Sequence, residues 1–286
     1  MTWYKKYLSV YEQPLQEAPQ EIIREINTKI EKLQSDTPLV SVVIIAYNEE
    51  KHLLANLWSL SDSECQYPME IIGVDNDSSD KTAEIFKMTG VPYYTEYEHS
   101  CGYARRCGLH HARGKYYICI DSDTMYPKTY IETLVKTLEK PDTVAVSSLW
   151  SYIPDKQHPW LAVKIYEFLR DLHLLLQSFK RPELSVRGLV FAYRIEYGRQ
   201  VGYRVEIKRG EDGSMAFALK KYGKIRFIRS RKARAVTGYG TVGADGSFFN
   251  SFKVRALKAL KNAGNLFTGK EEYKDEESNL IDKTRH

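Results

Sequence analysis

The sequence lacks the features that mark several special classes of protein. Its 286 residues include four cysteines at irregular spacing and no Cys-x-x-Cys pair, which excludes a zinc ribbon and a disulfide-stapled scaffold. No apolar run approaches the roughly eighteen residues that a membrane-spanning helix needs. Candidates such as Leu39–Ala46 and Leu172–Leu176 are far shorter. The first residues contain no sustained apolar stretch of the kind found in a secretory signal. We therefore expect a cytoplasmic protein with free thiols.

The net charge of the chain is also small, but the charged residues are unevenly distributed. The chain has 42 basic and 37 acidic residues and a net charge of +5, and at 43% hydrophobic residues it is not a disordered protein. Lys224–Arg234 holds six basic residues and no acid, and Gly246–Lys270 holds five and no acid. This concentration indicates a phosphate-rich partner, which composition leaves open as a nucleotide, a nucleic acid or an anionic membrane.

The first half of the chain alternates between apolar strands and helical patterns. Strands are expected over 39–46, 69–75, 91–94, 116–121 and 144–147, with helices over 51–60, 80–88, 102–112 and 128–138. Continuous apolar strands that alternate with helices predict an α/β fold, with a Rossmann-like, mostly parallel sheet covered on both faces. Ligands of such sheets bind beyond the carboxyl ends of the strands, so the residues that follow each strand are the candidates for a site.

The second half of the chain is mixed and predicts the other wall of a cleft. We expect helices over 160–179 and 213–222 and strands over 189–193 and 224–228. An amphipathic helix is expected over 15–34, ahead of the sheet. The predicted organisation is an N-terminal helical extension (1–37), a central domain (38–245, with halves 38–148 and 149–245) and a C-terminal basic amphipathic helix with a polar tail (246–286).

The C-terminal segment predicts an amphipathic helix. At about 100° per residue nine of its apolar side chains fall within an arc of roughly 120°. The residues in this arc are Phe248, Phe249, Phe252, Ala256, Ala259, Leu260, Ala263, Leu266 and Phe267, and Lys253, Arg255, Lys258 and Lys261 lie on the rest of the wheel. Two interpretations remain open: an interfacial helix that docks on an anionic membrane, and a helix that packs on the domain with its lysines in water.

Polar clusters follow the first two strands. Tyr47, Asn48 and Glu49 can contact a planar base and a ribose, although the same residues also suit a helix N-terminus. Asp75 and Asn76 follow the second strand, where a carboxylate and an amide can bind a base or ribose hydroxyls; the alternative is a turn that caps the next helix. Both clusters are therefore candidates for nucleoside binding.

The fourth strand ends in Asp121-Ser122-Asp123, which gives the sharpest signal of the sequence. In an extended chain the side chains at i and i+2 point the same way. Two carboxylates so close repel each other unless they share a proton or bind a cation. The pattern therefore favours Mg²⁺ or Mn²⁺ bound together with a diphosphate, rather than a simple loop.

Glu211 and Asp212 precede a predicted helix between two glycines. Neighbouring acids at the start of a helix often serve only as caps or as partners of the helix dipole. The alternative is a general base that points into the cleft, where the flanking glycines leave it accessible.

Taken together, these motifs resemble the family 2 glycosyltransferases, which are inverting enzymes with the GT-A fold. The likeness extends from about Pro38 to Thr237, and its five motifs occur in the family's order. They are the segments Ser41–Glu50, Val74–Thr82, Gly102–Thr124, Arg187–Arg194 and Arg209–Ile225.

The resemblance implies a role for each matching residue. Nucleotide-sugar binding falls to Ala46, Tyr47, Asn48, Glu49, Asp75, Asn76, Arg105, Asp121 and Ser122. Asp123, with Asp121, would hold the divalent cation, and Asp212, with Glu211 as the next candidate, would be the catalytic base. The second motif usually reads Asp-Asp-Gly, whereas this chain has Asn76 at the position that faces the base. A UDP-sugar remains the favoured donor.

The resemblance also implies the reaction, which is transfer of one hexosyl unit to a hydroxyl of a glycan or lipid-linked acceptor in polysaccharide biosynthesis. The chain lacks the Gln-x-x-Arg-Trp motif of processive synthases, so one sugar per encounter is expected. We expect a cytoplasmic enzyme, with a peripheral position on the inner face of the membrane, and no nucleic-acid partner. The alternatives are a sugar-nucleotide pyrophosphorylase and a nucleic-acid-binding module that uses the basic C-terminal quarter.

Overall fold

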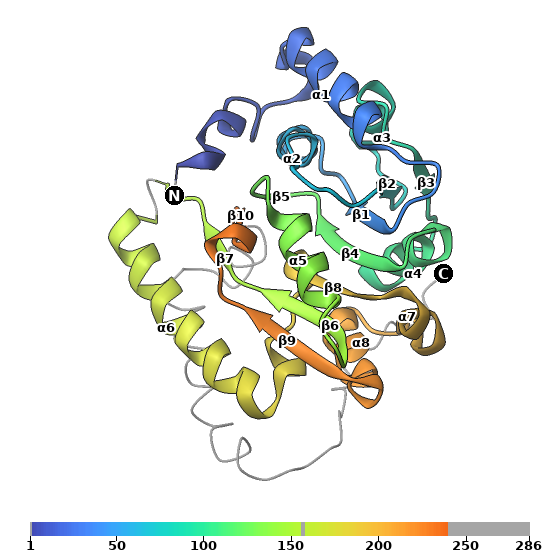
Figure 1. Ribbon diagram of the computed structural model, residues 1–286. Coiled ribbons are helices and arrows are strands. Elements are labelled where there is room, and N and C mark those ends of the chain that lie inside the picture. The colour runs from blue at the N-terminus through green and yellow to red at the C-terminus, as the bar shows by residue number, and fades with distance from the viewer. Residues whose placement is uncertain (1, 156–157, 240–286) are drawn as a thin grey trace.

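A seven-stranded sheet forms the centre of the protein in the computed structural model, which describes residues 2–155 and 158–239 (Figure 1). In spatial order its strands are β3 (Tyr93–Thr95), β2 (Met69–Asp75), β1 (Val40–Ala46), β4 (Tyr116–Asp121), β8 (Phe191–Arg194), β6 (Thr143–Ser148) and β9 (Lys224–Ile228). Strands β1 to β4 run parallel, and β8 is antiparallel to both of its neighbours. The prediction of a mostly parallel sheet is confirmed.

The register of the sheet brings three strand ends to one edge. Ala46 pairs with Asp75, and Ile45 pairs with Asp121. The polar segments that follow β1, β2 and β4 therefore leave the sheet side by side. These strands are almost fully buried, which is why each reads as a continuous apolar run.

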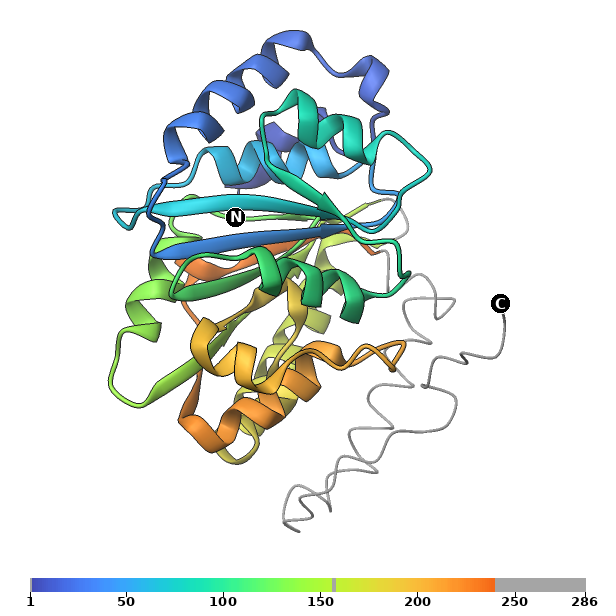
Figure 2. The same cartoon turned by 90° about the vertical axis from the view of Figure 1, so that its right-hand side faces the viewer.

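Helices cover both faces of this sheet, and each face has its own hydrophobic core. Figure 2 shows the sheet nearly edge-on, with α1 and α2 on one side and α4 and α8 on the other. The first core includes residues of α1 (Gln20–Leu33), α2 (Leu53–Ser61), α3 (Thr82–Met88), α5 (Tyr130–Leu138) and α6 (Trp160–Lys180). The second includes residues of α4 (Cys101–His111), α7 (Ile195–Val201) and α8 (Glu211–Leu219).

A small second sheet lies directly after the Asp121–Asp123 segment. Its central strand β10 (Ala235–Thr237) pairs antiparallel with β5 (Thr124–Met125) and parallel with β7 (Trp150–Tyr152). None of these three strands was predicted from the sequence, because two or three residues are too few to show an alternating pattern. The sheet fixes the chain that leaves Asp123.

The N-terminal segment packs on the main core. Tyr7, from the 3-10 helix η1 (Trp3–Ser9), is buried with Ile26 and Ile30 of α1. The helix expected over 15–34 is present but starts at Gln20, after a short 3-10 turn over Leu15–Glu17. The amphipathic helix expected within 246–286 lies outside the described residues. Within the described part of the chain, no helix has the length and hydropathy that crossing a membrane requires.

Candidate active site

The loop that follows β1 is tied to the loop that follows β2. Asn48 has a left-handed backbone (φ 53°), and its Oδ1 accepts a hydrogen bond from the N–H of Ser79 at 2.8 Å. The N–H of Glu49 donates to Oγ1 of Thr82 at 2.8 Å. Asn48 therefore fixes the loop with its side chain. Tyr47 is 53% exposed, and its ring meets His99 edge-on at 5.3 Å.

Asp75 and Asn76 are both buried at the end of β2. Asp75 Oδ1 has no hydrogen-bond partner among the described residues. Asn76 donates both amide hydrogens, to the carbonyl oxygens of Glu96 and Glu98, at 2.8 Å each. The Asn76 amide therefore holds the 96–98 segment, and only its oxygen remains to face a ligand. An unsatisfied buried carboxylate oxygen such as that of Asp75 is costly, which points to a donor group supplied by a ligand.

Three carboxylates gather where β1 and β4 end. Burial raises the pKa of Asp123, and the negative charge of Asp121 raises it further. Burial likewise raises the pKa of Glu49, with Asp123 adding to the effect. Each of these acids thus feels its neighbour, so Glu49, Asp121 and Asp123 form one region of negative potential that favours a cation.

This acidic cluster fits a divalent ion that also binds a ligand. Carboxylate oxygens are the preferred protein ligands of Mg²⁺ and Mn²⁺. Among residues 2–155 and 158–239 no group of three or more His, Cys, Asp and Glu side chains encloses a metal position. Asp121 and Asp123 would therefore supply only part of a coordination shell, and phosphate and water oxygens would supply the rest.

Arg105 of α4 connects the end of β4 with the start of α8. Its side chain is 1% exposed, and Nη2 binds Oδ1 of Asp121 at 2.5 Å. Its Nε lies 3.6 Å from Oδ1 of Asp212, and Nη1 donates to the carbonyl oxygen of Ile120 at 3.1 Å. One buried guanidinium thus brings together two acids that are distant in the sequence.

Asp212 is poised to exchange a proton near neutral pH. Burial raises its pKa to about 7, although the positive charge of Arg105 opposes this shift. The neighbouring Glu211 also raises the pKa, and a hydrogen bond with Tyr203 lowers it. Ser122, the remaining candidate, is buried in the turn between Asp121 and Asp123.

Several residues that surround these acids were not predicted from the sequence. His52 Nδ1 lies 2.7 Å from Oε2 of Glu49, and the hydroxyl of Tyr11 donates to the backbone carbonyl of Asp123 at 3.1 Å. Gly188 leaves room for the Arg105–Asp212 pair, because a Cβ atom there would lie 2.1 Å from Oδ2 of Asp212. The only feature of the sequence that pointed to Gly188 is its position within one of the five motifs, Arg187–Arg194.

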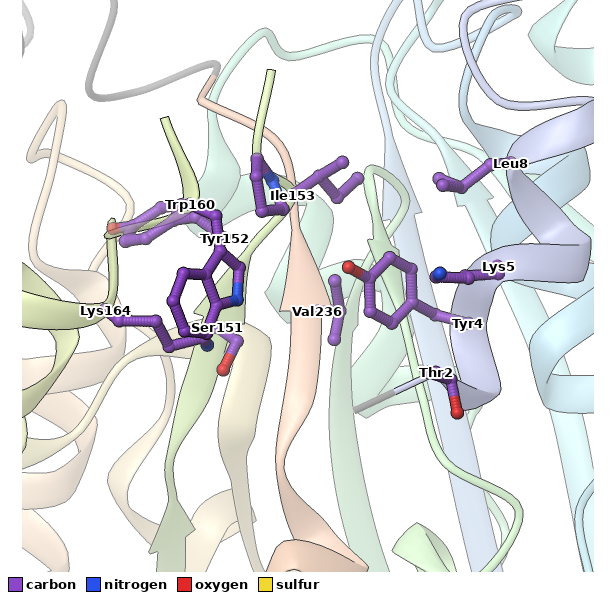
Figure 3. Close-up of a pocket in the computed structure, with 11 residues that line it drawn as sticks. Thr2, Tyr4, Lys5, Leu8, Ser151, Tyr152, Ile153, Trp160, Lys164 and Val236 are labelled. Atoms are coloured by element: carbon purple, nitrogen blue, oxygen red, sulfur yellow. The ribbon is translucent and has the colours of Figure 1, made fainter. Parts of the chain in front are cut away.

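A pocket of about 640 Å³ lies away from this acidic cluster (Figure 3). Tyr4 and Lys5 of η1 line one side, and Tyr152 and Trp160 line the other. None of the residues predicted for the site lines it. The candidate active site is therefore the open edge of the sheet between Glu49 and Asp212, and not this pocket.

Replacing Arg105 with methionine is expected to destabilise the protein. The change leaves the buried Asp212 and the half-buried Asp121 without their cation, and loss of one partner of a buried ion pair typically costs about 3–5 kcal/mol. The loss should be larger at pH 8 than at pH 5.5, because Asp212, with its pKa of about 7, is neutral at the lower pH. Urea unfolding at both pH values measures this. Arg106→Met is the control, since Arg106 is exposed on the same helix; equal losses in the two variants would contradict the role of the buried pair.

Comparison with known proteins agrees with this geometry. Residues 41–197 match the Glycosyl transferase family 2 domain, which is more than half of the chain. Chondroitin synthase of Escherichia coli is 25% identical over 206 residues, which cover 68% of this chain and 29% of that protein. The chain thus spans less than a third of the length of this relative.

Solved structures show the same fold. TarS residues 1–349 of S. aureus, in complex with UDP, superimposes with a TM-score of 0.54 and 18% identity, covering 70% of this chain and 60% of that one. The mannosyltransferase PcManGT of Pyrobaculum calidifontis, in complex with GDP-Man and Mn²⁺, gives a TM-score of 0.53 and 19% identity, covering 76% and 64%. The expectation of a GT-A type fold is confirmed.

Proposed function

The chain belongs to glycosyltransferase family 2, and from this premise we propose that it moves one sugar from a nucleotide-diphosphate sugar to an acceptor hydroxyl, with inversion at the anomeric carbon. The observation that carries the proposal is the Asp121–Arg105–Asp212 arrangement, in which one buried arginine joins the acids after β4 to the acid at the start of α8. The acids that would bind the cation, Asp121 and Asp123, therefore lie at the same edge of the sheet as Asp212, which would accept the proton.

The nucleoside would bind over the ends of β1 and β2. Asp75 supports this placement, since its buried Oδ1 has no partner among the described residues and suits an N–H of a pyrimidine base. Tyr47 is exposed beside the same edge and suits packing on the base or ribose. Ala46, Asn48, Glu49 and Asn76 would shape this part of the site. A UDP-sugar is the favoured donor, and TarS was solved with UDP.

A divalent cation, Mn²⁺ or Mg²⁺, would bind at Asp123 and Asp121, with Ser122 beside the diphosphate. When bound, such an ion spreads the negative charge that develops on the leaving diphosphate. PcManGT was solved with GDP-Man and Mn²⁺, which supports a cation in a fold of this type. His52 would hold the Glu49 side chain in place, and Tyr11 would hold the backbone of Asp123 in place.

Asp212 would accept the proton of the attacking hydroxyl. A carboxylate with a pKa of about 7 is half deprotonated at neutral pH, yet basic enough to take a proton as the hydroxyl attacks. Arg105 holds Asp212 in position, and Glu211 raises its pKa. Attack on the face opposite the leaving group gives inversion without a covalent intermediate.

The acceptor would be a glycan or a lipid-linked glycan, and the reaction a step of polysaccharide biosynthesis. A cytoplasmic position, peripheral on the inner face of the membrane, suits such an acceptor. Calorimetric titration with UDP, GDP, CDP and dTDP, each with and without Mn²⁺, tests donor recognition. We expect one nucleotide, UDP in the first place, to bind more tightly with Mn²⁺; binding of none of them would contradict the proposal.

Replacing Gly188 with alanine is expected to slow transfer without unfolding the protein. The new Cβ would meet Oδ2 of Asp212 at 2.1 Å and Nη2 of Arg105 at 2.7 Å, so both side chains must move. Displacing a catalytic group by about 1 Å costs on the order of 10²-fold in rate. Gly213→Ala is the matched control, because a Cβ at Gly213 meets nothing within 4 Å. Steady-state kinetics that show equal rates in both variants would contradict this role.

A further inference from the structure

Helix α6 is attached to the protein along one face only. Val163, Tyr166 and Leu174 are buried in the first hydrophobic core. The guanidinium of Arg170 lies 4.1 Å from the ring centre of Trp150, and Asp171 pairs with Arg234 at 2.5 Å. In Figure 1 the helix lies along the left-hand edge of the molecule. Its inner face is therefore fixed, and its outer face is directed away from both sheets.

The outer face of α6 consists of large apolar side chains. Seven of them are between 43% and 74% exposed: Leu161, Ile165, Phe168, Leu169, Leu172, Leu176 and Phe179. At about 100° per residue these seven fall within an arc of roughly 100°. We call this set the α6 apolar face. Trp160, 62% exposed, lies beside its first turn.

The α6 apolar face is larger than the apolar patches that are usually found on the surface of a monomeric protein. If a large apolar side chain presents about 150–200 Å² when fully open, these exposures amount to roughly 600–800 Å². The largest apolar patch on a typical monomer is about 300–600 Å². Standard-size stable interfaces bury about 600–1,000 Å² on each partner. The face therefore has the area that a stable dimer needs.

The spacing along the face fits another helix. Leu161, Ile165, Phe168 and Leu172 follow one another at intervals of four, three and four residues. This repeat of about 3.5 residues is the one that lets two helices interlock along a shared seam. Leu175, which is half-buried, and Phe179 continue it.

The charge of α6 does not suit an anionic lipid surface. Interfacial helices carry many lysines and arginines beside their apolar face. Helix α6 has only three basic residues, Lys164, Arg170 and Lys180, and it also has two acidic ones, Glu167 and Asp171. Lys164 binds Glu167 at 2.6 Å, and Arg170 binds Asp171 at 2.8 Å. With its charges largely paired inside the molecule, α6 suits an apolar protein partner.

We propose that the α6 apolar face binds the same face of a second copy of this chain. A two-fold axis near residue 170 would set the two helices antiparallel, so that Leu161 meets the partner's Phe179 and Phe168 meets the partner's Leu172. Such an interface is self-complementary, since one patch serves both copies. The acidic edge of the sheet contributes no residue to this face, so each copy keeps its own site.

Sedimentation velocity of the full chain at micromolar concentration tests the proposal. We expect a species of twice the 33.1 kDa of one chain. The double change Phe168→Glu and Leu172→Glu should raise the dimer dissociation constant by about 10²-fold or more, because it places charge at the centre of the interface. The control is Tyr97→Glu, a residue that is 73% exposed but lies outside the face, and it should remain a dimer. Circular dichroism melts check that all variants fold.

A second measurement tests the antiparallel arrangement. Residue 169 lies next to the proposed two-fold axis. In Leu169→Cys a short bis-maleimide should therefore join residue 169 of one copy to residue 169 of its partner. Peptide mass spectrometry identifies the cross-linked peptide. A wild-type chain that sediments as a single copy would overturn the proposal, and so would a double variant that remains dimeric. Flotation of a single-copy protein with phosphatidylserine vesicles would assign the face to a membrane. Dimerisation only after removal of residues 240–286 would assign it to that segment. Both outcomes overturn the proposal.

Discussion

Replacing Asp212 with asparagine is expected to slow sugar transfer by roughly 10²–10⁴-fold, the range for loss of a general base. Asparagine keeps the shape of the side chain and can still contact Arg105, but it cannot accept a proton. Donor affinity should therefore persist. Steady-state kinetics give the rate, and calorimetry gives the affinity for the nucleotide. A parallel loss of rate and affinity would make Asp212 a binding residue.

The pH dependence provides an independent test of the same role. Because burial raises the pKa of Asp212 to about 7, the base loses its free carboxylate as the pH falls through that value. In the wild type, kcat/KM should fall about tenfold per unit below about pH 7. The small residual rate of Asp212→Asn should lack this fall. Glu211→Gln is the control: it should retain the fall but shift it to lower pH, because Glu211 raises the pKa of Asp212. A fall of unchanged size in Asp212→Asn would place the base elsewhere.

Replacing Asp123 with alanine is expected to abolish metal-dependent transfer. Stabilisation of a leaving group by a cation contributes several kcal/mol, which corresponds to a loss of about 10²–10³-fold or more. The melting temperature should stay the same or rise, because the change removes a carboxyl group whose pKa is raised by burial and by repulsion from Asp121.

Titration with Mn²⁺ in the presence of the nucleotide measures the loss directly. Asp36→Ala, which removes an exposed acid far from the sheet edge, is the control and should bind as the wild type does. Full Mn²⁺-dependent activity in Asp123→Ala would exclude Asp123 as a metal ligand.

Most of the central sheet could be predicted because β1, β2, β4, β6 and β8 are buried on both faces. The bounds of β2 and β4 agree with the expected ranges, since both buried runs end at an aspartate. The bounds of the half-exposed β9 also agree with its expected range. The short strands β5, β7 and β10 could not be predicted, because tertiary pairing with Thr237 and its neighbours defines them, and no local pattern does.

The residues of the candidate site could be predicted from the sequence, but the contacts that join them could not. Strand-end position identified Asp121 and Asp123, whereas Arg105 entered only through the resemblance. That Arg105 bridges Asp121 and Asp212 depends on how α4 and α8 pack on the sheet, which no spacing in the sequence encodes. The left-handed Asn48 and the tie from Asn76 to Glu96 likewise follow from how two loops meet.

The most direct test of the central claim is proton NMR of donor hydrolysis by the purified chain. If Asp212 activates an acceptor hydroxyl as proposed, we expect it to activate water slowly when no acceptor is present, which releases the sugar from the donor. With UDP-α-sugars and Mn²⁺, we predict that the β-anomer of the free sugar forms first, that release stops when the cation is chelated, and that Asp212→Asn suppresses it. Initial release of the α-anomer, or no release from any nucleotide sugar with or without metal, would contradict an inverting, metal-dependent transferase at this site.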